Sequence, residues 1–319
     1  MAAPITTDVY AAAEVIRRGG LAAFATETVY GLGANALDPV AAARIFEAKQ
    51  RPAFDPLIVH IADRSMLAGL VREVPEAASK LIDRFWPGPL TVVLPKQNAV
   101  PDIVTSGLET VGVRLPAHEQ ARELIRSAGC PVAAPSANLF GHVSPTTARH
   151  VADQLGDRID IILDGGPCHV GLESTVVDCC GPVPRLLRPG GTTLEAIEGL
   201  IGPIEAQTQS SDGSAAPAPG MLERHYSPRT PLVVWQPGSA IPAGRIALLT
   251  WSSPPADPRF VRTVDLSPEG SLVEAAARLF AALRELDAAG LDAIYAVPFP
   301  EEGLGRAIND RLRRAAARG

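Results

Sequence analysis

A stretch poor in large apolar side chains divides this chain of 319 residues. It reads GPIEAQTQSSDGSAAPAPG and covers residues 202–220. Such a segment is typical of a linker or a mobile loop, because it cannot bury enough apolar surface to offset the entropy lost on ordering. The segments on either side are long enough to fold separately. We therefore expect a first domain over residues 1–203, a linker over 204–230 and a second, smaller domain over 231–319.

The composition is that of a globular protein, with 46% hydrophobic and 20% charged residues. No apolar run reaches the length of about 18 residues that a membrane span needs. Residues 1–10 do not have the basic-then-apolar pattern of a secretory signal. The cysteines lack the CxxC spacing of metal sites, and two of them are adjacent, so we expect a reducing, cytoplasmic location. The net charge of −6 argues against broad electrostatic binding of nucleic acid.

The first part of the chain alternates helical and strand patterns. Asp8 and Asp38-Pro39 are typical helix starts, and Pro52 must end the second helix near Lys49. Further helices are expected over 76–86, 119–127, 147–155 and 194–201. Strands are expected over 21–26, 57–61, 91–94, 110–115, 132–134, 159–163, 175–178 and 185–187. This pattern predicts an α/β fold with a large, open, twisted mixed sheet.

The second part predicts a smaller open α/β sheet. Residues 232–235, 246–251 and 293–297 have strand-like patterns. An amphipathic helix is expected over 271–288, and an arginine-rich helix over 304–317.

Two cations and a hydroxyl–amide pair are the first candidate functional residues. In an extended segment, side chains two positions apart share a face, so Lys49 and Arg51 can reach one polyphosphate. Alternatively, they complement the dipole of the preceding helix, which is worth about 0.3–1 kcal/mol. Ser136 and Asn138 lie among small residues and can give directed hydrogen bonds, although both are also common in turns.

Other strand ends repeat the same chemistry of hydroxyls and cations. Residues 26–33 (TETVYGLG) predict a strand that runs into a glycine-bearing turn, where backbone can approach a ligand. Thr110 and Arg114 share a strand face, and Ser174 and Arg188 pair a hydroxyl with a cation. His60 lies within an apolar strand, where histidine is usually a core residue but can also bind a carboxylate.

Motifs of other chemistries are absent. The sequence has no GxSxG elbow, no HExxH, no Walker A loop and no GxGxxG fingerprint. Hydroxyls, amides and cations suit charge stabilisation, as in phosphoryl or nucleotidyl transfer. We expect no metal ligands from protein side chains, and Mg²⁺ would accompany the nucleotide.

Several stretches together resemble the YrdC-like family in its long, two-domain form. They are TETVYGLGANA, KQRP followed by PLIVH, VGVRLP, APSAN with GHVSPT, GLESTVVD and LLRPG. In the second part, PGMLERHYSPRTPL resembles the family's linker and GLGRAINDRLRRAA its C-terminal domain. The resemblance implies an open, twisted α/β sheet with a positively charged concave face.

The resemblance also implies an activity. Members join L-threonine, bicarbonate or CO2, and ATP into threonylcarbamoyl-adenylate and pyrophosphate. A separate transferase complex then passes the threonylcarbamoyl group to adenosine 37 of tRNA, so direct tRNA binding is not required. By position, the residues bordering threonine would be Thr28, His60, Arg114, Ala134 and Ser174. Those bordering ATP would be Arg51, Asp55, Thr110, Ser136, Asn138, Ser144, Arg188, Arg224 and Tyr226, with Lys49 and Arg51 as the catalytic cations.

One position departs from the family pattern. Asp55 stands where asparagine is usual, and an aspartate near phosphates would repel them unless it turns away or meets the metal. In the linker, Arg224, His225 and Tyr226 match a segment thought to close over the nucleotide, which predicts a lid.

Three alternatives remain open at this stage. A basic concave sheet could bind RNA. A different carbamoyl-adenylate enzyme would use another acceptor, and a nucleotide-binding regulator would not turn over.

Overall fold

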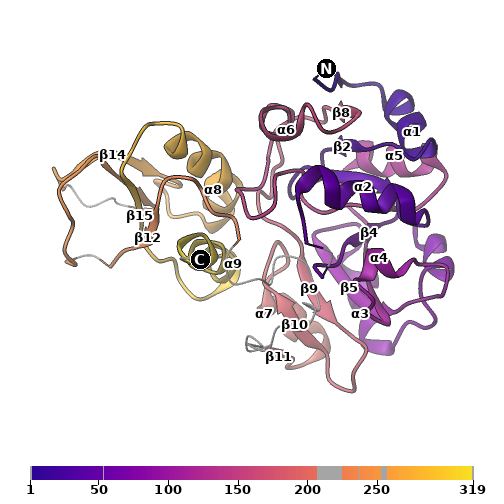
Figure 1. Ribbon diagram of the computed structural model, residues 1–319. Coiled ribbons are helices and arrows are strands. Elements are labelled where there is room, and N and C mark those ends of the chain that lie inside the picture. The colour runs from indigo at the N-terminus through magenta and orange to yellow at the C-terminus, as the bar shows by residue number, and fades with distance from the viewer. Residues whose placement is uncertain (1, 53, 207–224, 237, 253–256, 318–319) are drawn as a thin grey trace.

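The computed structural model describes residues 2–52, 54–206, 225–236, 238–252 and 257–317. Figure 1 shows a larger N-terminal lobe and a smaller C-terminal lobe. Within the described residues, no helix is long and apolar enough to cross a membrane. Arg224, a predicted nucleotide contact, lies outside the described residues.

The first lobe contains, in its described part, an 11-stranded sheet in the order β1-β8-β2-β3-β7-β4-β6-β5-β9-β10-β11. The sheet contains parallel pairs such as β4–β6 and β5–β9 and antiparallel pairs such as β2–β3 and β5–β6, which confirms the predicted mixed sheet. The strands are β1 (Ile5–Thr6), β2 (Ala22–Phe24), β3 (Gly31–Asn35), β4 (Ile58–His60), β5 (Leu90–Pro95), β6 (Thr110–Arg114), β7 (Val132–Ala133), β8 (Ile161–Leu163), β9 (Thr175–Asp178), β10 (Arg185–Arg188) and β11 (Glu205–Ala206). Strand β11 pairs with β10, so the sheet continues into the predicted linker.

Helices surround this sheet, and local capping explains where several begin. Asp8, Asp38, Thr147 and Thr193 each accept backbone N–H groups at a helix start. The helices are α1 (Val9–Arg17), α2 (Pro39–Lys49), α3 (Glu76–Phe85), α4 (Asp102–Thr105), α5 (Glu119–Ala128), α6 (Ala148–Leu155) and α7 (Leu194–Ile201), with a 3₁₀ segment over Arg64–Gly69. The main apolar core packs between these helices and the sheet.

The prediction of a glycine-bearing turn after residue 26 is wrong in part. A turn follows β2, but the two glycines lie in the next strand. Gly31 and Gly33 lie within β3, which pairs antiparallel with β2 and β7. A Cβ on Gly33 would lie 2.7 Å from both Phe24 Cε1 and Val132 Cγ1. Glycine is therefore required here by the close approach of neighbouring side chains.

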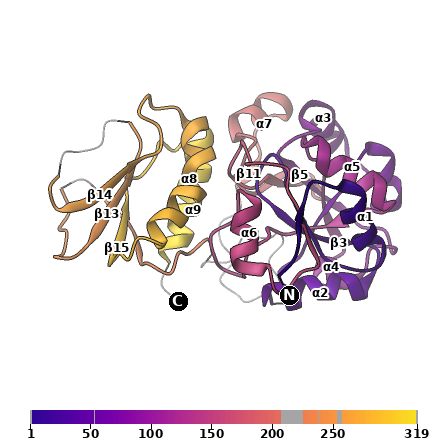
Figure 2. The same ribbon diagram turned by 90° about the horizontal axis from the view of Figure 1, so that it is seen from above.

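The second lobe has, among its described residues, a 4-stranded parallel sheet in the order β12-β15-β13-β14. Its strands are β12 (Leu232–Val234), β13 (Ile246–Thr250), β14 (Phe260–Asp265) and β15 (Ala293–Ala296), and its helices are α8 (Leu272–Asp287) and α9 (Gly303–Ala316). The arrangement confirms the predicted smaller open α/β domain, to which the structure adds β14. Figure 2 shows α8 and α9 between this sheet and the first lobe.

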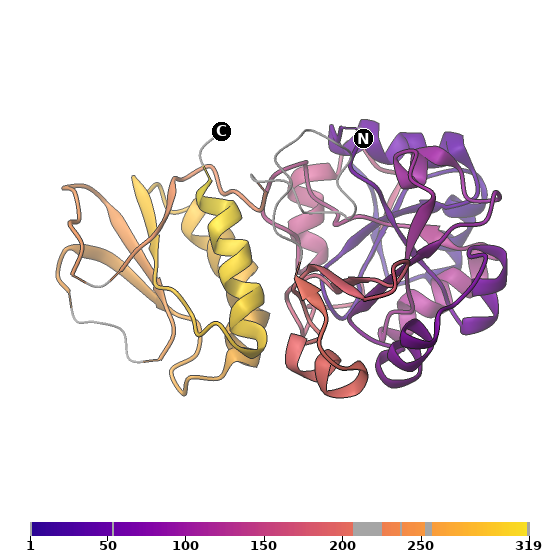
Figure 3. The same cartoon turned by 90° about the horizontal axis from the view of Figure 1, so that it is seen from below.

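The two lobes pack against each other. Figure 3 shows from below that the helices of the second lobe face the first. Val29, Val143 and Leu172 of the first lobe belong to the apolar cluster built on α8 and α9. At Gly171 the backbone has φ +73°, and a Cβ there would lie 2.5 Å from the Ala276 carbonyl oxygen and the Ala277 Cα. On α8, Arg284 donates hydrogen bonds to the carbonyl oxygens of Val143 and Ser144. The second domain therefore packs directly against the first.

Candidate active site

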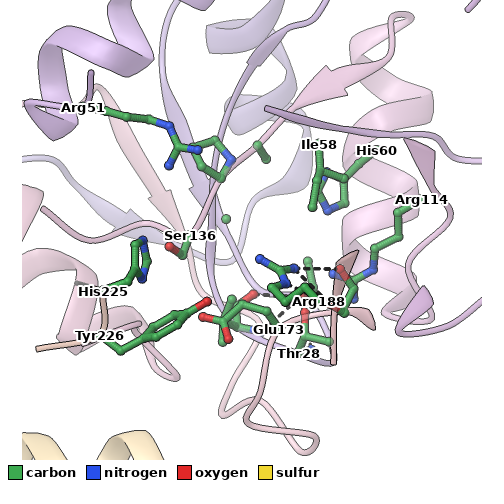
Figure 4. A pocket seen from close by; sticks show the side chains of 16 residues that line it. Thr28, Arg51, Ile58, His60, Arg114, Ser136, Glu173, Arg188, His225 and Tyr226 are labelled. Carbon is green, nitrogen blue, oxygen red and sulfur yellow. Dashed lines mark hydrogen bonds between the residues drawn. The ribbon is translucent and has the colours of Figure 1, made fainter. Parts of the chain in front are cut away.

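A polar pocket lies on the first domain where it meets the start of the second (Figure 4). Its empty volume is about 500 Å³, counted out to its open mouth. The residues lining it are Thr26, Thr28, Val29, Gly31, Arg51, Ile58, His60, Arg114, Ala134, Pro135, Ser136, Glu173, Ser174, Arg188, His225 and Tyr226. All five residues predicted to border threonine are among them, so the sheet brings these separate motifs together.

The loop between β2 and β3 presents Thr28 to the pocket. Thr26 Oγ1 donates to the carbonyl oxygen of Val29 at 2.7 Å and lies 2.8 Å from Thr28 Oγ1. Both hydroxyls are buried, so the turn is held by its own side chains.

Arg114 is held in place by a buried carboxylate. Its Nη2 lies 2.7 Å from Glu27 Oε1, and its Nε donates to the carbonyl oxygen of Gly88 at 3.3 Å. Burial opposes ionisation of Glu27, but the Arg114 charge prevails and lowers the pKa of that carboxyl. The pair therefore stays ionised, with the guanidinium at the pocket wall.

His60 is opposite Arg114 in the β4–β6 register and lines the pocket next to it. Burial, followed by the nearby Arg114 charge, lowers the pKa of His60 to about 3. Its imidazole is therefore neutral near pH 7. Among the described residues, Nδ1 has no hydrogen-bond partner, so it can meet a ligand.

Arg51 reaches the pocket from the end of α2, where Gln50 has a left-handed backbone at φ 53°. Arg51 Nη2 lies 2.9 Å from Asp55 Oδ2, and both side chains are almost fully buried. Its Nε and Nη2 also donate to the carbonyl oxygens of Asp55 and Pro56. Asp55 does not line the pocket. The carboxylate that departs from the family pattern thus turns to Arg51, behind the pocket wall.

Lys49 connects the two motifs that were predicted to act together. Its Nζ donates to the carbonyl oxygens of both Ser136 and Asn138. Burial lowers the pKa of Lys49 well below its usual value. Ser136 lines the pocket, whereas Lys49 and Asn138 do not; the Asn138 amide donates to Leu139 and His142 carbonyls. In this structure Lys49 therefore anchors the 136–138 loop.

Ser174 and Arg188 meet where β9 begins and β10 ends. Arg188 Nη2 donates to Ser174 O at 2.9 Å and to Ser174 Oγ at 3.3 Å, and Ser174 Oγ lies 2.8 Å from Thr91 Oγ1. Burial lowers the pKa of Arg188. The predicted hydroxyl–cation pair is thus brought together at the pocket.

Two predicted nucleotide contacts lie beside the pocket. Ser144 Oγ donates to Glu173 Oε1 and is fully buried. Thr110 lines a separate small hollow with Thr91, Thr105 and Gly112, and this hollow shares Ile58 with the main pocket.

The described end of the linker forms one wall. His225 and Tyr226 both line the pocket, and Tyr226 has a left-handed backbone at φ 63°. Tyr226 stacks on Phe280 of α8 with ring centroids 5.6 Å apart. Its buried hydroxyl has no hydrogen-bond partner among the described residues.

Glu173 is the lining residue with ionisable chemistry that motif reasoning did not assign. It stood in the quoted stretch GLESTVVD, directly before Ser174. An acidic residue next to a predicted substrate contact was the available signal. Among the described residues, no group of three or more His, Cys, Asp or Glu side chains could hold a metal ion.

Comparison with known proteins matches both domains. The family model Sua5–YciO–YrdC, described as "Telomere recombination", matches residues 14–190. The chain belongs to the Sua5–YciO–YrdC family. A second model, described as "Threonylcarbamoyl-AMP synthase, C-terminal domain", matches residues 192–317 of this Sua5–YciO–YrdC member.

Relatives resemble nearly the whole chain. The threonylcarbamoyl-AMP synthase of Pyrococcus abyssi is 47% identical, covering 96% of this chain and 93% of its own length. That of Bacillus subtilis is 46% identical, covering 96% and 92%. The crystal structure of P. abyssi Sua5 complexed with L-threonine superposes with a TM-score of 0.87 at 44% identity, covering 97% of this chain and 94% of that chain.

Proposed function

We propose that this chain is an L-threonylcarbamoyladenylate synthase. The observation that carries the proposal is the gathering of Thr28, His60, Arg114, Ala134 and Ser174 around one pocket, together with Arg51, Ser136 and Arg188. Two-domain relatives bearing the name threonylcarbamoyl-AMP synthase, and a similar structure described as complexed with L-threonine, support it.

The threonine end of the pocket would hold a zwitterion. Arg114, fixed by Glu27, offers a guanidinium fork for the carboxylate of threonine. Neutral His60 and the hydroxyls of Thr28 and Ser174 can exchange hydrogen bonds with its polar groups. Ala134 leaves room beside them.

The nucleotide end would hold ATP with Mg²⁺ as part of the substrate. Arg51 and Arg188 offer positive charge to the phosphates, and Ser136 and the Tyr226 hydroxyl offer hydrogen bonds. Asp55 pairs with Arg51, so it would keep that guanidinium oriented instead of repelling phosphate. Mg²⁺ would be held mainly by phosphate oxygens and water.

The reaction joins three substrates in two bond-forming steps. The threonine amine attacks CO2, supplied directly or by dehydration of bicarbonate, and loses a proton to give a carbamate. A carbamate oxygen then attacks the α-phosphorus of ATP, and the bond to the β-phosphate oxygen breaks as magnesium pyrophosphate leaves. Arg51 and Arg188 would stabilise the charge that develops on the phosphates.

The product would serve tRNA modification. A threonylcarbamoyl-adenylate must be consumed by a transferase, which we propose to be the complex that modifies adenosine 37 of tRNA in the cytoplasm. Direct tRNA binding by this chain is not required for that order of events.

Pyrophosphate release tests the proposal. The protein is incubated with ATP, Mg²⁺ and bicarbonate, with and without threonine, and release is expected to depend on threonine. Arg51→Ala is expected to lower the rate at least ~100-fold, as loss of transition-state charge stabilisation does. Lys49→Ala is also expected to lower the rate, because the Lys49 Nζ anchors the loop that carries Ser136. Arg72→Ala removes an exposed ion pair with Glu109 and is the matched control, with an unchanged rate. Release without threonine dependence, or wild-type rates in both site variants, would overturn the proposal.

A further inference from the structure

Arg311 of α9 reaches the wall of the pocket from the second domain. Although its side chain is fully buried, it does not line the pocket. Its Nε lies 3.0 Å from Glu173 Oε2, and its Nη1 donates to the carbonyl oxygen of Pro189 at 2.8 Å. Glu173 precedes Ser174, and Pro189 follows Arg188. The Arg311 guanidinium thus contacts the residues directly before Ser174 and directly after Arg188 in the sequence, and these are two predicted substrate contacts.

The two carboxylates that pair with Arg311, those of Glu173 and Asp310, would respond differently to its loss. Asp310 lies 2.8 Å from Arg311 and 3.0 Å from Arg314, so it keeps one cation if Arg311 is removed. Glu173 forms an ion pair with Arg311 through one carboxylate oxygen, and its other oxygen accepts from Ser144 Oγ. Loss of Arg311 would therefore leave the Glu173 carboxylate without its cation.

Glu173 is close enough to Arg188 for that loss to matter. Both side chains line the pocket beside Tyr226 (Figure 4). Burial lowers the pKa of Arg188, and the charge of Glu173 acts in the opposite direction. A Glu173 carboxylate released from Arg311 would attract Arg188 and repel an anionic ligand.

We infer that Arg311 is a positioning residue for the nucleotide end of the pocket. It neutralises Glu173, so that Glu173 does not compete with the phosphates of the substrate for Arg188. The second domain therefore supplies a charge on which the first domain's binding site depends. This inference rests on the proposed function, because it takes a polyphosphate to be the ligand of Arg188.

Affinity for MgATP, measured by calorimetry without threonine, tests the inference. Arg311→Met is expected to weaken binding at least tenfold. Glu173→Gln is nearly isosteric, and alone it is the reference for the double variant. The double variant Arg311→Met/Glu173→Gln is expected to bind more tightly than Arg311→Met alone, because the unneutralised charge is gone. A residue needed only for packing would give a double variant at least as weak as the single one.

Two comparisons keep the result interpretable. Arg306→Met removes an exposed ion pair between α9 and Glu195, and is expected to leave MgATP affinity unchanged. If Arg311→Met does not fold, as judged by circular dichroism, Arg311→Lys replaces it. Lysine keeps the charge without the fork, so Arg311→Lys should bind MgATP more weakly than wild type, and adding Glu173→Gln should restore part of the affinity.

The inference and the proposed function can fail separately. Rescue by Glu173→Gln together with threonine-independent pyrophosphate release would keep the inference and overturn the function. Threonine-dependent release without rescue, or with unchanged affinity in Arg311→Met, would overturn the inference alone. Absence of MgATP binding by the wild-type protein would overturn both.

Discussion

At the scale of single residues, buried charge sets what the pocket can do. Arg51 and Arg114 each form an ion pair with a buried carboxylate, Asp55 and Glu27, and neither carboxylate lines the pocket. Each carboxylate therefore fixes the orientation of its guanidinium. Breaking such a pair by removing one partner is costly, about 3–5 kcal/mol, because the other charge stays buried. Substitutions at Glu27 or Asp55 are therefore expected to act through their arginine partners.

His60 makes stability depend on pH. Its pKa of about 3 in the folded protein lies below the usual value of 6.5, so protonation favours the unfolded chain. Stability is present above pH 6.5 and is lost as the pH falls toward 3. From pH 7.5 to pH 5, this residue alone should lower the free energy of unfolding by about 2 kcal/mol.

Urea unfolding at the two pH values measures this effect. His60→Asn should reduce the pH dependence by about that amount. Equal pH dependence in wild type and His60→Asn would contradict the assignment.

At the scale of elements, close packing explains β3, one of the strands that the sequence pattern did not predict. β3 contains two glycines, which are rare in strands, so its sequence predicts a turn. Antiparallel pairing with β2 and β7 overrides that preference.

Gly33→Ala tests the close packing of β3. The added methyl would meet Phe24 and Val132 at 2.7 Å, which should destabilise the protein by about 1–3 kcal/mol. Gly69→Ala is the control, because a Cβ there meets nothing within 4 Å. Chemical denaturation of both variants gives the comparison, and equal stabilities would argue against the packing explanation.

Helix boundaries and most strands were predictable because their signals are local. Asp8 and Asp38 are the predicted N-cap residues of α1 and α2. Helix α7 covers residues 194–201, as the sequence pattern predicts. The partners of Asp55, Glu173 and Lys49 were not predictable in this way. Arg311, for example, is 138 positions from Glu173, and no pattern in either motif specifies that distance. Motifs thus identified many residues that line the pocket, although Lys49, Asp55, Thr110, Asn138 and Ser144 lie outside its lining. The long-range charge pairs required the tertiary fold.

At the scale of the whole molecule, the boundary between the domains is a packed interface. At Gly171 the backbones of the two domains approach closely. Both its φ of +73° and the nearby α8 backbone exclude a side chain. Gly166 has a similar φ of +78° but nothing within 4 Å of a Cβ.

Comparing Gly171→Ala with Gly166→Ala therefore separates the cost of a left-handed backbone from the cost of disturbing the contact between the domains. Gly166→Ala should cost about 1 kcal/mol from the left-handed backbone alone. Gly171→Ala should cost clearly more and should make the boundary more susceptible to proteolysis, because α8 must move away. Urea midpoints and limited trypsin digestion provide the measurements; matching losses of stability would mean that α8 exerts no constraint there.

Tyr226 belongs to the pocket wall and, through Phe280, to the core of the second domain. Binding and domain association therefore share one free-energy cycle. Any ligand that favours the associated arrangement must strengthen association by the same factor by which association strengthens ligand binding. Cutting the chain ahead of residue 225 would remove this coupling. The first domain would keep most of the residues that line its pocket, but it would no longer be joined to the second domain whose association strengthens binding.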